Sequence, residues 1–557
     1  MADSRSPSPS ASAAASATGF TTDVTPGLAD RQGAWAPLGN RVFRALWIAT
    51  VASNVGTWVN DTASAWMMTE MASSPLLVSL VQVATTLPIC LLAIPAGVLA
   101  DIVDRRRLLI AAQSWMALSA LALAALAALE LLNPVHLLML TFCLGIGAAL
   151  TMPAWSATVP ELVGPGELAA AVALGSLGMN IARAVGPALG GFVVAGIGSA
   201  WAYVLNALSF CGVIATLVLW RQTVVTSELP PENFSAAMRA GWRYVREAPA
   251  VQAVLVRCVA FFAFASATWA LLPVVARHDL HGNATLYGAL LGAVGIGAIA
   301  GALVLPRARR RMSANTLVAA ASLLYAAMTA IIGLATSLWL IIPCMLLTGA
   351  AWLAMMSSFQ IAAQTAVPAW VRARTLALNI VAFSGSMAAG SAVWGAVASA
   401  FGSSVALGLA ALGAAASLLL GRRFPLHEGN VEGQATSAHW PEPVVVAEVD
   451  HDRGPVLVTI EYEVDAETVT AFLAAITRLG HVRRRDGASR WGIFEDAARP
   501  GTWVEAFIVP SWLDHLRQHA RVTQADRVVE QAVRHHHRGP DLPRVRHLLA
   551  PAALSQR

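Results

Sequence analysis

Two opposite charges, Asp61 and Arg183, stand inside otherwise apolar stretches of the chain. Charged side chains are costly in a hydrocarbon environment, so those found there are functional candidates by default. A carboxylate that gains and loses a cationic partner changes its hold on a proton, which lets it couple proton movement to a conformational change. We therefore predict a proton-coupling charge switch at Asp61 and Arg183. The alternative is a static ion pair, or an Asp61 that merely faces water.

Such charges need membrane-spanning helices to hold them. Of the 557 residues, 57% are hydrophobic and 12% are charged, whereas a soluble protein carries about 25% charge. About twelve segments have the roughly twenty apolar residues that a span requires. They form two groups of six, in 41–220 and 253–423, separated by the polar stretch 221–252. At 1.5 Å per residue, Asp61 and Arg183 fall at similar depths, about 25 and about 22 Å along their helices. The predicted fold is an all-α polytopic membrane protein with two six-helix halves.

Arginine placement predicts the orientation of these spans. All basic residues are arginines, and seventeen of those near the span ends fall on one side, against Arg277 alone on the other. Cytoplasmic loops hold the excess of basic residues, so both termini are expected in the cytoplasm. Residues 1–40, rich in Ser, Ala and Pro, are expected to form a disordered cytoplasmic tail. The absence of lysine excludes a P-loop and Schiff-base chemistry.

Amide side chains at intramembrane depth are candidates for lining a cavity between the halves, although buried amides also serve to hold helices together. The candidates are Asn54, Asn60, Asn180, Asn206 and Gln364, with Asn54 and Asn60 foremost.

The turn between the second and third expected spans carries Gly97, Asp101, Arg105 and Arg106. These residues resemble the Gly-x-x-x-Asp-Arg-x-Gly-Arg-Arg pattern of the major facilitator superfamily. The resemblance implies that Asp101 and Arg105 latch the two halves together on the cytoplasmic side when the carrier faces outward. Asp101 would then lie at the positive N-terminus of the helix expected from 375. In the alternative, the arginines only set topology.

A second motif lies in the fifth expected span, at Gly186, Pro187, Gly190 and Gly191. It resembles the Gly-Pro-x-x-Gly-Gly motif of proton-driven exporters in the same superfamily. Small residues allow close helix approach and proline bends a helix, so we expect a seal on the outer side. Plain helix packing is the alternative. Thr141 stands where well-known drug-proton antiporters have an arginine.

Two further stretches, 56–75 and 364–374, are similar to the branch of the superfamily that contains the enterobactin exporter. The resemblance implies secondary, proton-coupled export of a small organic molecule, siderophore-like or drug-like, by alternating access in the inner membrane of a bacterial cell. The expected partners are this substrate, protons and the lipid bilayer, with no nucleic acid and no cofactor.

A soluble domain is expected after the linker 424–442. Residues 443–538 show the order strand, helix, strand, strand, helix, which predicts a small α+β ferredoxin-like domain, followed by a disordered tail over 539–557. The domain resembles the antibiotic-monooxygenase-like fold, in which two copies often pair, so a homodimer through this domain is possible.

The side chains of this domain leave open whether it binds a ligand. Trp491, Trp503, Phe507 and Trp512 are expected to pack in the core, with a ligand pocket as the alternative. His515 and His519 share one helix face, but a metal needs a third and a fourth ligand, so no metal site is expected.

Two other functions stay open on the sequence alone. One is a membrane-tethered enzyme with a monooxygenase-like C-terminal domain. The other is a membrane sensor that transports nothing.

Overall fold

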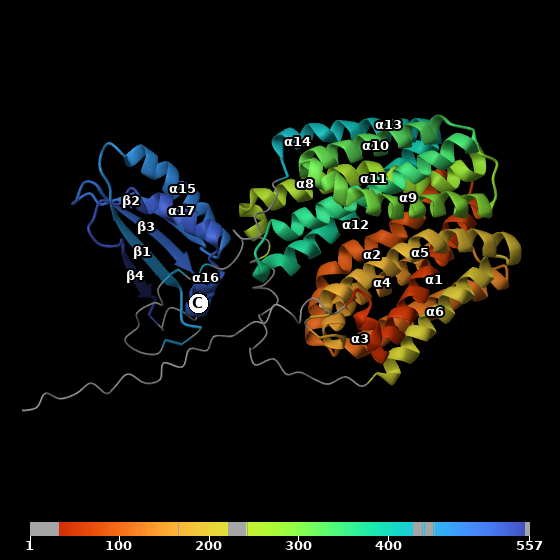
Figure 1. The fold of residues 1–557 in the computed structure, drawn as a ribbon, viewed down its shortest axis with the longest axis horizontal. Coiled ribbons are helices and arrows are strands. Elements are labelled where there is room, and N and C mark those ends of the chain that lie inside the picture. Colours follow the sequence, from red (N-terminus) through yellow and green to blue (C-terminus); the bar gives the residue numbers. More distant parts are fainter. Residues whose placement is uncertain are drawn as a thin grey trace, which may run out of the picture.

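The computed structural model describes residues 33–164, 166–220, 241, 243–426, 437, 439–440, 449–450 and 452–551, except the side chains of Asp101 and Ala369. Most of the predicted N-terminal tail and linker lies outside the described residues. Long helices form a bundle, beside which stands a small sheet domain (Figure 1). The helices of the first half are α1 (Arg41–Met71), α2 (Pro75–Ile102), α3 (Arg105–Ala128), α4 (Pro134–Leu162), α5 (Leu168–Ile197) and α6 (Ser199–Leu219). Those of the second half are α8 (Pro249–Val274), α9 (Ala284–Arg311), α10 (Ala314–Leu334), α11 (Leu338–Thr365), α12 (Ala369–Phe401) and α13 (Ser403–Ala416), which runs on through η3 (Ser417–Leu419) into α14 (Leu420–Arg423).

Membrane-spanning character follows from length and composition. Within the described ranges, eleven helices are long and apolar enough to cross a membrane. Helix α1 has 31 residues and is also long enough, but it carries Asp61, Glu70 and several amides. It lies against α5 and α6, and polar side chains such as Asn60 and Ser64 are buried there. The predicted fold of two six-helix halves is confirmed.

Polar side chains begin several helices at the bundle surface. Asn133, Asn283 and Asp104 accept hydrogen bonds of 2.8 to 3.0 Å from backbone N–H groups in the first turns of α4, α9 and α3. Such caps satisfy donors that a helix start leaves without a partner.

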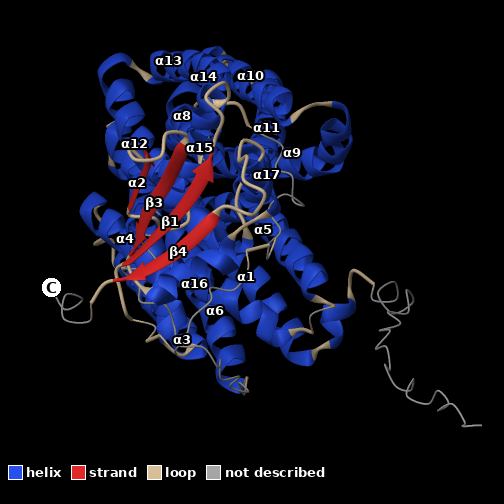
Figure 2. Ribbon diagram, turned by 90° about the vertical axis from the view of Figure 1, so that its left-hand side faces the viewer, coloured by secondary structure: helices blue, strands red, loops and turns tan. Residues whose placement is uncertain are grey.

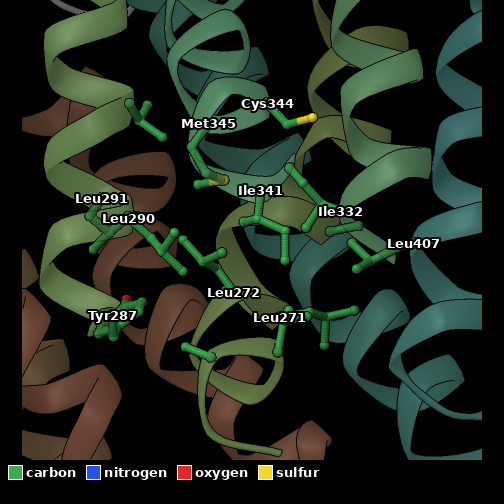
Figure 3. Close-up of a cluster of buried hydrophobic side chains, with 14 of the residues drawn as sticks. Leu271, Leu272, Tyr287, Leu290, Leu291, Ile332, Ile341, Cys344, Met345 and Leu407 are labelled. Atoms are coloured by element: carbon green, nitrogen blue, oxygen red, sulfur yellow. The ribbon is translucent and has the colours of Figure 1, made fainter. Parts of the chain in front are cut away.

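Apolar clusters show where the two halves meet. In the largest cluster, Trp66 of α1 packs among residues of the second half. Figure 3 shows the part of this cluster built by α8, α9, α10, α11 and α13. Val274 of α8 packs in turn among residues of the first half. Both contacts lie at the end of the bundle opposite the arginine-rich loops. At the arginine-rich end, each apolar cluster of described residues draws on one half only. The halves are therefore joined at the far end and apart at the arginine-rich end.

The C-terminal domain is an antiparallel sheet covered by helices on one face (Figure 2). Its elements are β1 (Val456–Glu463), α15 (Val469–Arg485), β2 (Arg490–Glu495), β3 (Thr502–Val509), α16 (Trp512–Arg521), α17 (Gln524–Arg534) and β4 (Arg544–Leu549). The strand order is β2-β3-β1-β4, which is the ferredoxin-like arrangement. The predicted α+β class is confirmed.

Two details of this domain differ from the prediction. The tail 539–557 was expected to be disordered, but it contributes β4, which pairs with β1 along its length. Its sequence does not show the pattern expected of a strand, because an edge strand with an exposed face tolerates arginines at alternate positions. The last helix of the predicted element order is two helices, because Thr523 and Asp526 form a capping box that starts α17.

The core of the domain encloses a charge network. Arg483 Nε donates to Glu505 Oε1 over 3.2 Å, and Tyr462 and Trp491 donate to the same carboxylate. Both partners of the ion pair are buried. Near it, burial raises the pKa of Glu530, but Arg483 and the hydrogen bonds from Trp440 and His439 outweigh burial and lower this pKa to about 2.

The domain contacts the second half of the bundle at its arginine-rich end (Figure 1). His481 of α15 lies 3.0 Å from Glu247, and Arg484 lies 3.9 Å from the same carboxylate. The Arg521 guanidinium of α16 sits over the Trp370 ring of α12, 4.2 Å from its centroid.

Candidate functional site

A cavity of about 300 Å³ lies between the two halves, midway along the helices. It is lined by α1, α2 and α5 of the first half and by α8, α9, α11 and α12 of the second. Its charged lining and its Thr and Gln side chains come from the first half, at Asp61, Thr62, Gln82, Thr85, Thr86 and Arg183, and the second half adds Tyr287. Its size is at the low end of small-molecule pockets.

Helix α1 presents Asp61 to this cavity on a continuous face. Trp58, Asp61 and Ala65 all line it, at the three- and four-residue spacing that keeps side chains on one side of a helix. The side-chain amide of Asn60 donates to Asp61 over 3.5 Å, a long contact. Asp61 is therefore held only weakly by its surroundings, and its carboxylate is available to the cavity.

Helix α5 presents Arg183 to the same cavity. Its guanidinium lies over the Trp58 ring, 6.0 Å from the ring centroid. Across the part of the chain that the structure describes, no ion pair within 4.0 Å joins Arg183 to Asp61. The two charges predicted to form a switch thus share one cavity, but they are not in contact in this conformation.

Aromatic rings form a wall that crosses from one half to the other. Trp58 of α1 lies 6.3 Å from Trp269 of α8, which lies 4.9 Å from Trp352 of α11. Phe383 of α12 continues the wall at 6.2 Å from Trp352. Such a surface suits a flat, partly apolar ligand.

A polar contact joins the two halves at the end of the bundle opposite the arginine-rich loops. Glu70 of α1 lies 3.7 Å from Arg277, which follows α8 in the second half. The Trp66 indole N–H donates to Glu70 over 2.7 Å, and Arg277 lies over the Trp66 ring. Nearby, the Ser74 and Ser399 hydroxyls are 3.3 Å apart across the same junction.

The motif at 186–191 supplies the closest backbone approach at this end. A Cβ placed on Gly191 would lie 2.3 Å from the Ala284 carbonyl oxygen of α9, and one on Gly288 would lie 2.4 Å from the Pro187 carbonyl oxygen. Only glycine allows α5 and α9 to pack this closely. The other two motif glycines, Gly186 and Gly190, face α1.

Comparison with known proteins places this architecture in a family. A family model described as transmembrane secretion effector matches residues 32–555. The chain belongs to this family, within the major facilitator superfamily.

Curated relatives match part of the chain. The enterobactin exporter EntS of Salmonella typhi is 28% identical over 262 residues, 47% of this chain and 62% of the exporter. The staphyloferrin A transporter of Staphylococcus aureus is 25% identical over 256 residues, 45% of this chain and 64% of that protein. The matches thus span less than two thirds of the length of these curated relatives.

Solved structures share the transporter fold. A POT family transporter in complex with a thioalcohol-conjugated peptide aligns with a TM-score of 0.58 at 14% identity, covering 69% of this chain and 96% of that one. A bacterial homologue of the iron transporter ferroportin, in an inward-facing state, aligns with a TM-score of 0.55 at 13% identity, covering 69% and 97%.

The predicted latch belongs to the state that faces outward, whereas the halves are apart at the arginine-rich end in this structure. Arg105 bonds to Glu161 and to the Ala157 carbonyl of α4, and Arg106 donates to the carbonyls of Leu217 and Val218 at the end of α6. These bonds stay within the first half, because the halves are apart at this end. Gly97 has open space around it, and the Asp101 side chain lies outside the described part.

The predicted cavity amides are dispersed. Asn54 lies one turn before Trp58 on the cavity face of α1, and Asn180 lies one turn before Arg183 but bonds to the Ser176 carbonyl. Asn60 is buried beside Asp61. Two others lie away from the cavity: Asn206 of α6 is buried against Gly56 of α1, and Gln364 is exposed near the end of α11.

The sequence analysis missed the aromatic wall of the cavity. Trp269, Trp352 and Phe383 lie in apolar spans, where an aromatic residue facing lipid, core or cavity shows the same local pattern. On α2, Gln82 does mark a cavity-lining position in the sequence, because a side-chain amide in a membrane span is costly unless it has a role. In the C-terminal domain, the predicted core positions Phe507 and Trp512 are buried in the sheet cluster, with Trp491 and Trp503 packed against it.

Proposed function

We propose that this transporter exports a small organic molecule from a bacterial cell in exchange for protons, with Asp61 as the proton-carrying group. The observation that carries the proposal is the cavity between the halves, which Asp61 and Arg183 both line. A cavity at the junction of two helical halves is where rocking of one half against the other would alternate access.

The proposed orientation places the arginine-rich end, both termini and the C-terminal domain in the cytoplasm. With this orientation, the structure corresponds to a state closed to the outside by α5, α9 and the Glu70–Arg277 contact. Substrate would then enter from the cytoplasm, where the halves are apart.

The charges of the cavity supply the coupling. Arg183 holds an anionic or polar group of the substrate while Asp61 is ionised. After the far end opens, the substrate leaves, and Asp61 takes a proton from outside. The neutralised carboxyl returns with the carrier and releases its proton to the cytoplasm. One substrate leaves and one proton enters in each such cycle.

The substrate class follows from the cavity wall. Three tryptophans and a phenylalanine around one arginine favour a flat molecule that bears an anionic or strongly polar group. Siderophores and aromatic drugs have this chemistry. The names of two relatives, the enterobactin exporter and the staphyloferrin A transporter, support the siderophore class.

Pairing of two chains through the C-terminal domain is part of the proposal. The sheet face opposite the helices carries apolar side chains, among them Leu457, Ile508 and Leu548 in one row across three strands. Leu548 and Phe494 are more than half exposed. Light scattering of the detergent-solubilised chain tests this: we expect a dimer that Leu548→Glu converts to monomer, and a monomeric wild type would contradict it.

The test of transport uses proteoliposomes with a trapped pH dye and a panel of siderophores and aromatic drugs. We expect substrate-dependent proton movement in the wild type and none in Asp61→Asn. Among the described residues, the hydrogen bond to the Asp61 side chain is the long 3.5 Å contact with Asn60, so the isosteric amide should leave folding and substrate exchange intact. Glu167→Gln is the matched control, since Glu167 precedes α5 without capping it. Wild-type coupling in Asp61→Asn would refute the assignment.

A further inference from the structure

Three histidines converge in the C-terminal domain, outside the transport machinery. His515 and His519 lie on α16, and His547 lies on β4. One ring nitrogen from each lies within 4.8 Å of the other two. The Nε2 atoms of His515 and His519 are 3.3 Å apart. We propose that these three side chains bind a Zn²⁺ ion.

The fold brings the third histidine to the other two. His547 pairs with Val458 across β1, and Val458 pairs with Phe507 across β3. Val458 and Phe507 are buried under the helices, so His547 ends a row that points to the helix-covered face. Helix α16 lies over this edge, and its i, i+4 spacing turns His515 and His519 to the same side. The expectation of no metal rested on two histidines, because the tail that supplies His547 was expected to be disordered.

The distances fit a tetrahedral zinc ion. Zinc bonds histidine nitrogen at about 2.0 to 2.1 Å, so two nitrogens on neighbouring corners of a tetrahedron are about 3.3 Å apart. The His515–His519 separation already equals this value. His547 needs a shift of at most about 1.5 Å to complete the triangle, which a side-chain rotation on an edge strand supplies. Three histidines leave the fourth position to water.

Neutral imidazole is the form of histidine that binds metal. The Nδ1 of His515 lies 3.4 Å from Gln518 Oε1. When His515 Nδ1 carries the proton and donates it to Gln518, the Nε2 lone pair faces the cluster. Metal-binding histidines commonly donate their other ring N–H in this way.

The nearby positive charge does not prevent binding. Arg483 lowers the pKa of both α16 histidines, which shows that its field reaches them. Its charge is compensated, because it pairs with Glu505 and also interacts with Glu530. The cluster is thus nearly neutral without metal.

The test uses the full chain, purified without a polyhistidine tag and stripped with a chelator. Co²⁺ is the probe because its visible absorption reports tetrahedral nitrogen coordination, and Zn²⁺ is added to displace it. We expect one tetrahedral Co²⁺ per chain, displaced by one Zn²⁺, and a higher unfolding temperature of the domain with Zn²⁺ than without. His547→Ala should weaken binding at least about tenfold, since even outer-shell changes cost this much.

A matched control separates the cluster from other histidines. His535 and His536 lie at the end of α17, outside the cluster, so alanine at both should leave affinity unchanged. If His547→Ala unfolds the metal-free domain, His519→Ala makes the same test from the other element. Absence of a tetrahedral Co²⁺ spectrum, wild-type affinity in a folded cluster variant, or loss of binding in the His535 and His536 variant would each overturn the proposal.

Discussion

Replacing Gly191 by alanine tests whether the contact between α5 and α9 closes the transporter at its far end. The added Cβ would lie 2.3 Å from the Ala284 carbonyl oxygen and 3.0 Å from the Gly288 Cα. These are backbone atoms, so the helices must separate by about 1 Å to reach ordinary contact distance. The two halves would be wedged apart where they now meet.

The size of the effect follows from the cost of overpacking. An extra methyl group in a tight contact costs about 1 to 3 kcal/mol, and only the conformation closed at the far end bears this cost. The ratio of that conformation to the one open at the far end should therefore fall by about 5- to 150-fold.

Labelling of the cavity measures this ratio. Thr85 lines the cavity, so Thr85→Cys, with the five native cysteines replaced, reports access when intact cells are treated with an impermeant maleimide. We expect slow labelling of Thr85→Cys when Gly191 is retained, and much faster labelling when Gly191→Ala is added. Gly196→Ala is the matched control, because Gly196 lies on the same helix with no atom within 4 Å of an added Cβ. Equal labelling of the two alanine variants, or slower labelling of Gly191→Ala, would refute the reasoning.

Three further outcomes concern the C-terminal domain. Arg483→Leu should lower the free energy of unfolding of this domain by about 3 to 5 kcal/mol, because Glu505 is left buried and unpaired. Denaturant titration measures this change, and an unchanged midpoint would contradict the buried pair. Glu247→Ala should speed hydrogen exchange in residues 243–247, since it removes the contact with His481; unchanged exchange would show that this contact does not hold the domain. The pKa of Glu530 is about 2 in the folded state, below its ordinary value of 4.5. Its contribution to stability is therefore present above pH 4.5 and is lost as the pH falls toward 2. Glu530→Gln should remove that part of the acid dependence of the unfolding temperature, and an unaltered profile would count against it.

The sequence was enough to predict the fold class and the charges of the cavity. Twenty-residue apolar segments report spans directly, because the bilayer fixes the length of a helix that crosses it. Asp61 and Arg183 were found for the same reason, since a charge at that depth is exceptional. Their distance from each other in this conformation was not predictable, because it depends on how the two halves are tilted.

The parts that the sequence did not reveal are those built by pairing across long separations. Glu70 and Arg277 meet only because α1 and α8 end at the same junction. Strand β4 was missed because its partner β1 lies far away in sequence, and its own residues alternate arginine with apolar side chains without a buried face. His547 was missed with it, and so was the third histidine of the cluster.

Helix α5 carries both Arg183 and the glycine motif, which the sequence analysis predicted as separate features. Arg183 and the start of the glycine motif lie within one turn of α5, and Gly186 approaches the Cβ of Trp58. Trp58 in turn lies under the Arg183 guanidinium and one turn from Asp61 on α1. Because α5 is held to α9 only where glycines permit, separation of these helices at the far end must also move Arg183 relative to the aromatic wall of the second half. In the proposed transport cycle, opening of the far end and a change in the charges around the substrate then follow from a single helix movement.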